Sequence, residues 1–104
     1  MKRNAFTMKL KPGYAEEYKK RHDQIWPELK ALLSDKGISD YSIYLDHNTL
    51  TLFAVQQLAD NFNPQSIAQD PLVKKWWAFM ADIMETNPDN SPNEGALTEV
   101  FYMK

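Results

Sequence analysis

The chain contains no cysteine, which excludes disulfide bonds, thiolate metal sites and cysteine nucleophiles. It also lacks an excess of one charge, because 12 basic and 14 acidic residues leave a formal net charge of −2. A protein with this balance has no electrostatic reason to bind a phosphate backbone or an anionic membrane. Nucleic acid and membrane are therefore not expected partners.

Long apolar runs are missing as well. No stretch of the sequence approaches the ~20 apolar residues that a membrane-spanning helix needs. Near the N-terminus, Lys9 and Lys11 interrupt the apolar stretch that a secretory signal would require. We therefore expect the protein to be cytoplasmic.

Glycine is scarce, with only three in 104 residues, and no glycine-rich phosphate loop occurs. The carboxylates are scattered without metal-ligand spacing, so neither a metal nor a nucleotide cofactor is expected. Aromatic residues, in contrast, make up 12% of the chain. Each can bury a large apolar area, and the length fits one domain spanning residues 1–104.

The hydrophobic pattern predicts an alternation of strands and helices. Four segments show the period of two that is typical of strands: 4–10, 41–46, 50–58 and 97–103. Two segments repeat apolar residues at helical spacing: 14–34 and 70–84. The resulting order β-α-β-β-α-β predicts a ferredoxin-like α+β sandwich, with its helices on one face of an antiparallel sheet.

Prolines and glycines predict where these elements begin and end. Pro27 predicts either a kink in the first helical segment or two helices, with Pro27 near the start of the second. Gly37 is expected to follow the end of this segment. Asp70 is an expected N-cap with Pro71 in the first helical position. Residues 60–69 are polar and are expected to form a loop or a short helix.

The strands are apolar on both sides. Phe53, Val55 and Phe101 contribute apolar side chains that a single layer of helices cannot all cover. A homodimer that packs sheet against sheet would cover them, and we hold this as a hypothesis.

His22 is the most interesting candidate for chemistry. It lies one helical turn after Tyr18 and one turn before Trp26, on the apolar stripe of the first helix. It could be a core or interface histidine whose ring nitrogens are satisfied. It could instead be a general acid or base that faces a cleft, since its usual pKa suits proton transfer near neutral pH. His47 is the weaker candidate because it lies at an expected hairpin turn.

Trp76 and Trp77 are adjacent on the second helix, so their side chains point about 100° apart and cannot enter the same core. One could be core and the other dimer interface, or together they could form an aromatic wall against the apolar face of a sugar. Tyr18 and Tyr41 carry hydroxyl groups that could face the same site, but either could also be a core residue.

Several segments of the chain resemble the L-rhamnose mutarotase family. Two motifs are specific: His-x-x-Ile-Trp-Pro-Glu-Leu at 22–29 and Asn-Pro-Asp-Asn-Ser-Pro at 87–92. Further similar segments are 17–22, 41–46, Trp76-Trp77 with Met80 and Asp82, and 99–102. The resemblance covers essentially the whole chain and is weakest over 56–70.

The resemblance implies a ferredoxin-like sandwich that assembles as a dimeric α/β barrel. It implies that His22 is the proton donor and that four residues contact the sugar: Tyr18, Tyr41, Trp76 and Trp77. The implied activity is the interconversion of the α and β anomers of L-rhamnopyranose, by acid–base catalysed ring opening and closure at C1 and without a cofactor, in rhamnose catabolism.

Two other classes of function stay open at this point. A cofactorless oxygenase of the dimeric ferredoxin-like type shares the expected architecture, and a fold does not fix a function. Such an enzyme would consume oxygen with quinol-like compounds. A non-catalytic sugar-binding module would show quenching of tryptophan fluorescence by rhamnose without faster anomer exchange.

Overall fold

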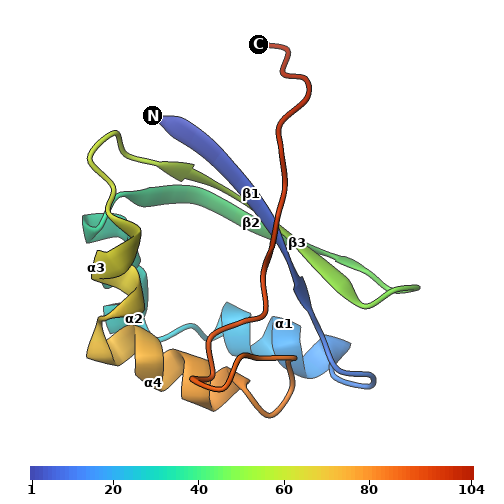
Figure 1. Ribbon diagram of the computed structural model, residues 1–104. Coiled ribbons are helices and arrows are strands. Elements are labelled where there is room, and N and C mark those ends of the chain that lie inside the picture. The colour runs from blue at the N-terminus through green and yellow to red at the C-terminus, as the bar shows by residue number, and fades with distance from the viewer.

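The computed structural model describes all residues from 1 to 104 and shows a small α+β fold built on one antiparallel sheet. Its strands are β1 (Lys2–Lys9), β2 (Ile38–Asp46), β3 (Thr51–Leu58) and β4 (Gly95–Ala96). They lie in the order β2-β3-β1-β4, and each neighbouring pair is antiparallel (Figure 1).

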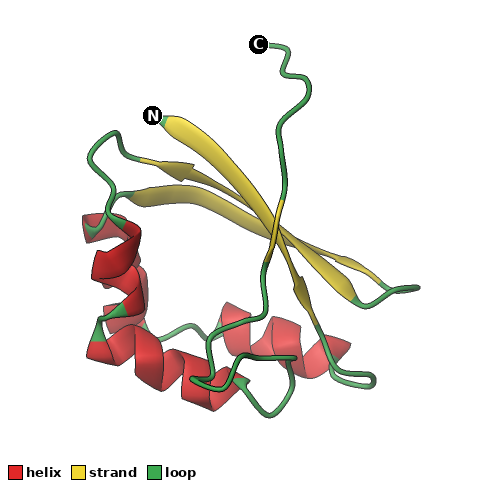
Figure 2. Cartoon of the chain, in the orientation of Figure 1, coloured by secondary structure: helices red, strands yellow, loops and turns green.

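The helices are α1 (Ala15–Asp23), α2 (Pro27–Asp35), α3 (Pro64–Ala68) and α4 (Pro71–Met80). All of them lie on the same side of the sheet (Figure 2). None is long and apolar enough to span a bilayer.

Local sequence signals explain where the helices begin and end. Trp26 has an extended backbone, with φ −56° and ψ 126°, and Pro27 is the first residue of α2, as steric restriction before proline favours. Of the two arrangements that Pro27 predicted, the structure has two helices rather than one kinked helix. Gly37 follows α2 with a φ of +99°, and Asp70 Oδ1 accepts a hydrogen bond from Leu72 N at 2.9 Å. Both were predicted.

The predicted segment 60–69 contains the short helix α3, whose N-cap is Asn63. The predicted helix over 70–84 ends earlier, at Met80. The chain turns there, so that Ile83 accepts a hydrogen bond from the backbone of Lys11 at 2.9 Å. Met84 pairs with Leu10 in an isolated bridge. Leaving the helix therefore lets both apolar residues enter the core.

β2 contains a bulge next to Tyr41, one of the predicted site residues. Ile38 pairs with Leu58 and Ile43 pairs with Ala54, so β2 has one residue more than β3 between these pairs. Asp40 has a positive φ of 46° in this interval. Because side chains alternate along a strand, residues five positions apart would normally face opposite sides, and the extra residue lets Ile38 share the inner face with Tyr41 and Ile43.

The core lies between the helices and the inner face of the sheet. Its residues come from the sheet, from three helices and from the segment after α4: Met8, Leu10, Tyr18, Leu29, Leu52, Ala54, Val73, Trp76, Met80, Ile83 and Met84. The outer face has no such cover. Tyr44 is 65% exposed there, and its pairing partner Phe53 is 38% exposed.

The prediction of a strand over 97–103 is wrong. β4 consists only of Gly95 and Ala96, and Leu97 makes the last ladder bond, to Ala5 O at 3.2 Å. From there the tail continues without regular structure toward the N-terminal end of β1, where Arg3 binds Glu99 and lies over the ring of Tyr102 (Figure 1). Val100 is 92% exposed and Phe101 is 77% exposed. Apolar residues do alternate along this segment, but within one chain no surface covers the apolar side chains of Val100 and Phe101.

Candidate active site

An open cavity of about 1730 Å³ lies between the inner face of the sheet and the helices. It exceeds the range of about 300–1,000 Å³ that is usual for small-molecule sites. All of the predicted site residues line it: Tyr18, His22, Tyr41, Trp76 and Trp77. The structure therefore brings residues from α1, β2 and α4 to one place.

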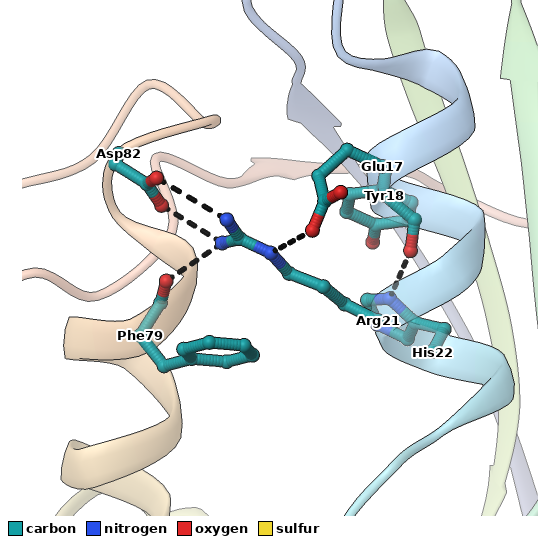
Figure 3. A network of polar contacts seen from close by, with 6 residues as sticks. All are labelled: Glu17, Tyr18, Arg21, His22, Phe79 and Asp82. Atoms are coloured by element: carbon teal, nitrogen blue, oxygen red, sulfur yellow. Dashed lines mark hydrogen bonds and ion pairs between the residues drawn. The ribbon is translucent and has the colours of Figure 1, made fainter.

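α1 places Tyr18 and His22 on the same face, because residues four positions apart on a helix are neighbours. Their rings stack with centroids 4.3 Å apart and an angle of 27° between the planes. Tyr18 is only 7% exposed, whereas His22 is half-buried. Nδ1 of His22 lies 3.1 Å from the backbone oxygen of Tyr18 (Figure 3).

This contact determines which ring nitrogen of His22 carries the hydrogen. A carbonyl oxygen can only accept a hydrogen bond, so Nδ1 is the donor and Nε2 keeps a free lone pair in the neutral ring. Burial lowers the pKa of His22 below its usual value, and the hydrogen bond to Tyr18 only partly opposes this effect. At neutral pH the imidazole is therefore mainly neutral, with Nε2 available as a proton acceptor.

Trp76 meets the edge of the His22 ring, with centroids 5.5 Å apart and an angle of 87°. It also packs at 5.0 Å against Trp26, which follows α1. Trp76 is 9% exposed and belongs to the core, whereas Trp77 is half-buried. Both line the cavity, and Trp76 is at the same time a core residue.

Tyr41 approaches the cavity from the sheet, and its ring meets the ring of Phe6 at 6.4 Å. Desolvation raises the pKa of Tyr41, and the Glu94 carboxylate raises it further. Desolvation also raises the pKa of Tyr18. Both phenols therefore stay protonated at neutral pH and can donate hydrogen bonds to a ligand.

Sequence reasoning missed a polar pair on the cavity side of the sheet. Gln56 is the only buried polar residue, at 6% exposed, and its Oε1 accepts a hydrogen bond from Asn4 Nδ2 at 3.0 Å. The register of β1 and β3 pairs these two residues directly. The available signal was a polar side chain at an inward position of each strand.

Two charged residues were also missed. Glu94 lines the cavity just before β4, and desolvation raises the pKa of its carboxyl group. Arg21, next to His22, binds Glu17 and Asp82. The spacing of Glu17 and Arg21 on a helix was the available signal for the first of these ion pairs.

The remaining candidate, His47, also lines the cavity but takes no part in the ring contacts of Tyr18, His22 and Trp76. His47 is exposed in the turn after β2, where the sequence predicted a turn. Nowhere in the chain do three His, Asp or Glu side chains gather closely enough to hold a metal ion.

Comparison with known proteins gives consistent matches over the whole chain. The family model described as L-rhamnose mutarotase matches residues 3–103. An L-rhamnose mutarotase of Flavobacterium johnsoniae is 60% identical over 101 residues, which are 97% of this chain and 94% of that protein. One from Bacteroides thetaiotaomicron is 59% identical over 103 residues, 99% of each chain. The crystal structure of an L-rhamnose mutarotase from Formosa agariphila matches with a TM-score of 0.93, at 55% identity over 100% of both chains.

Proposed function

Because the chain belongs to the L-rhamnose mutarotase family, we propose that it is an isomerase that interconverts the α and β anomers of L-rhamnopyranose in rhamnose catabolism. One observation supports this proposal above the others. A neutral imidazole, with Nδ1 bound to a backbone carbonyl, lines a cavity together with phenol and indole side chains. The reaction needs a proton-transfer group and a site for a sugar ring, and this arrangement offers both.

Mutarotation opens the cyclic hemiacetal and closes it again on the other face of C1. During opening, the C1 hydroxyl loses a proton and the ring oxygen gains one, so no net proton is consumed. Positioned acid–base catalysis typically contributes about 10²–10⁴-fold to such a step. Sugars already mutarotate slowly in water, so this contribution is of a useful size.

In this proposal, Nε2 of His22 accepts the proton from the C1 hydroxyl, and the imidazolium then donates it to the ring oxygen. Both oxygens are bonded to C1, so one nitrogen can serve both. The lowered pKa of His22 supports this role, because it keeps the resting ring able to accept and makes the imidazolium a stronger acid. After rotation about the C1–C2 bond, the same transfers in reverse close the ring to the other anomer.

The other residues bind the sugar. We assign the phenols of Tyr18 and Tyr41 to sugar hydroxyl groups, since both stay protonated. Trp76 and Trp77 offer apolar surface to the ring and its methyl group. The Gln56 amide nitrogen, which donates no hydrogen bond within the chain, supports a ligand rich in hydroxyl groups. No cofactor enters this mechanism.

The family match and the names of the relatives support the mutarotase over the oxygenase and over the non-catalytic sugar-binding module. No feature of the cavity favours either alternative.

We also propose that residues 1–104 form one ferredoxin-like domain and that two chains assemble as a dimeric α/β barrel. The strand order β2-β3-β1-β4, with helices on one side only, supports the ferredoxin-like domain. The exposed apolar residues of the outer sheet face and of the tail support the dimer. A cytoplasmic location stays a prediction from the sequence.

Magnetisation transfer between the anomers of L-rhamnose, with and without the protein, tests the proposed activity. We expect the wild-type protein to accelerate exchange and His22→Ala to lose about 100-fold or more, since it lacks the proton-transfer group. His47→Ala, which removes the other histidine, is the matched control and should exchange at the wild-type rate. A folded His22→Ala variant with full exchange activity would refute the role of His22.

A further inference from the structure

Arg21 joins the helix that carries His22 to the segment that follows α4 (Figure 3). Its Nε donates a hydrogen bond to Glu17 Oε2 at 2.8 Å, one turn earlier on α1. Its Nη1 and Nη2 donate to the two carboxylate oxygens of Asp82, at 2.8 and 3.2 Å. This bidentate arrangement is the geometry in which a guanidinium binds a carboxylate most specifically.

The same guanidinium also binds the end of α4 itself. Nη1 of Arg21 donates a hydrogen bond to the backbone oxygen of Phe79 at 2.8 Å. Carbonyl groups in the last turn of a helix lack partners within the helix, so Arg21 caps α4 from another element. The guanidinium carbon also lies 4.5 Å from the centroid of the Phe79 ring. Arg21, Asp82 and Phe79 together are called the α1–α4 clamp below.

The clamp is charged, and its arginine is largely removed from solvent although its carboxylate is not. The Arg21 side chain is only 13% exposed. The hydrogen bond to Asp82 raises the pKa of Arg21 above its usual value, and the same bond lowers the pKa of Asp82. Both groups therefore keep their charges through the physiological pH range, and the contact persists there.

The clamp shares its rings with the candidate active site. The Phe79 ring contacts Trp76 at 5.6 Å and Trp26 at 5.7 Å. Trp76 in turn meets His22 at 5.5 Å. One chain of contacts therefore leads from the guanidinium of Arg21 to the imidazole of the next residue.

α1 depends on such contacts for its position. It has nine residues, and the residue before it, Tyr14, provides no side-chain cap. Helices this short are unstable in isolation and are held by packing against the rest of the protein. The helix that carries His22 and Tyr18 is therefore fixed relative to α4 through side chains, and Arg21 makes the most directional of these contacts.

We propose that Arg21, together with Asp82, is a positioning residue for anomer exchange, because it sets the spacing between His22 on α1 and Trp76 on α4. This inference rests on the proposed function, since it requires that His22 and Trp76 both contact the sugar. A displacement of about 1 Å in such a site can cost about 100-fold in rate. The clamp thus acts through His22 and Trp76 and does not touch the sugar.

Arg21→Met tests the proposal most directly. Methionine, like arginine, has an unbranched side chain, but it is apolar and donates no hydrogen bond. Glu17 and Asp82 are 40% and 64% exposed, so neither carboxylate is left buried without a partner. We expect kcat for anomer exchange to fall about 10- to 100-fold, with a smaller change in KM. Arg21→Lys and Asp82→Asn, which each keep part of the contact, should lose less activity.

Two further measurements separate positioning from charge and from folding. Lys20→Met removes a positive charge from the same helix at an exposed residue whose side chain makes no hydrogen bond or ion pair, and it should keep the wild-type kcat. All rates are measured well below the melting temperature of each variant. The midpoint of the pH profile should stay the same in Arg21→Met, because positioning changes the rate and not the charge state of His22.

The proposal is wrong if Arg21→Met keeps kcat within twofold of the wild type, if Lys20→Met loses as much, or if the pH midpoint shifts enough to explain the loss. If Arg21→Met does not fold, Asp82→Asn is the test instead. An unchanged kcat in that variant overturns the proposal. A wild-type protein that does not accelerate exchange would instead overturn the proposed function. The two failures are therefore distinguishable.

Discussion

At the scale of single residues, the chemistry depends on how α1 presents the imidazole of His22. The sequence places Tyr18 and His22 four positions apart, and this spacing predicted that they share a face. It could not predict that Nδ1 binds the carbonyl of Tyr18, because this depends on the rotamer of the side chain. The direction of the pKa shift was equally out of reach, since burial follows from the packing of other elements.

The lowered pKa of His22 predicts a specific pH dependence. Only the neutral ring accepts a proton at Nε2, so kcat/KM should be constant above the pKa of His22 and should fall as the pH drops through it. Because burial lowers this pKa below 6.5, the midpoint should lie below 6.5. Anomer exchange measured across this range, after subtraction of the spontaneous rate, checks the prediction. A midpoint above 6.5 would contradict it.

Tyr18→Phe should separate binding from packing. The change removes the hydroxyl group but keeps the ring that stacks on His22. A neutral hydrogen bond contributes about 0.5–1.5 kcal/mol, so we expect an increase in KM of about 2- to 12-fold. Kinetics by magnetisation transfer measures KM, and Tyr14→Phe, which changes an exposed tyrosine outside the cavity, is the control. An unchanged KM in Tyr18→Phe would remove Tyr18 from the binding site.

At the scale of elements, the sequence predicted most helix and strand positions, and the exceptions have physical reasons. The signals at Pro27, Gly37 and Asp70 are local, and the structure uses each of them. The tail after Ala96 follows the pattern of a strand without forming one. A periodic pattern shows which sides a strand could bury, whereas strand formation needs a continuous ladder of backbone hydrogen bonds, and the ladder with β1 ends at Leu97.

Gly37 should be much less tolerant of substitution than Gly13. Both have a positive φ, +99° and +87°, which costs other residues about 1–2 kcal/mol. A Cβ atom on Gly37 would also lie 2.8 Å from Cβ of Ala59, whereas one on Gly13 would have no neighbour within 4 Å. Thermal unfolding should therefore show a larger fall in melting temperature for Gly37→Ala than for Gly13→Ala. Equal falls would show that the contact with Ala59 carries no cost.

At the scale of the whole molecule, the exposed apolar side chains are the feature that one chain leaves unexplained. The outer sheet face exposes Tyr44, Phe53 and Val55, and the tail exposes Val100 and Phe101. Exposed apolar surface of this kind often marks an interface. The sequence predicted that both faces of the sheet are apolar, but a pattern within one chain cannot specify what covers the second face.

Phe53→Asp should therefore shift the protein from dimer to monomer. The substitution places a charge in the middle of the outer face, where burial without a partner is unfavourable. Sedimentation velocity at low micromolar concentration measures the change. Ala31→Asp, on the exposed side of α2, adds the same charge away from the sheet and should stay dimeric. A wild-type protein that sediments as a monomer would contradict the proposed dimer.

The bulge in β2 lets two residues an odd number of positions apart, Ile38 and Ile43, share one face of the sheet. Removing Asp40 would restore a regular pleat in which Ile38, Tyr41 and Ile43 occupy every second position, so all three would still face the helices. A relative that lacks one residue between Ile38 and Ser42 should therefore still direct the same phenol into the cavity.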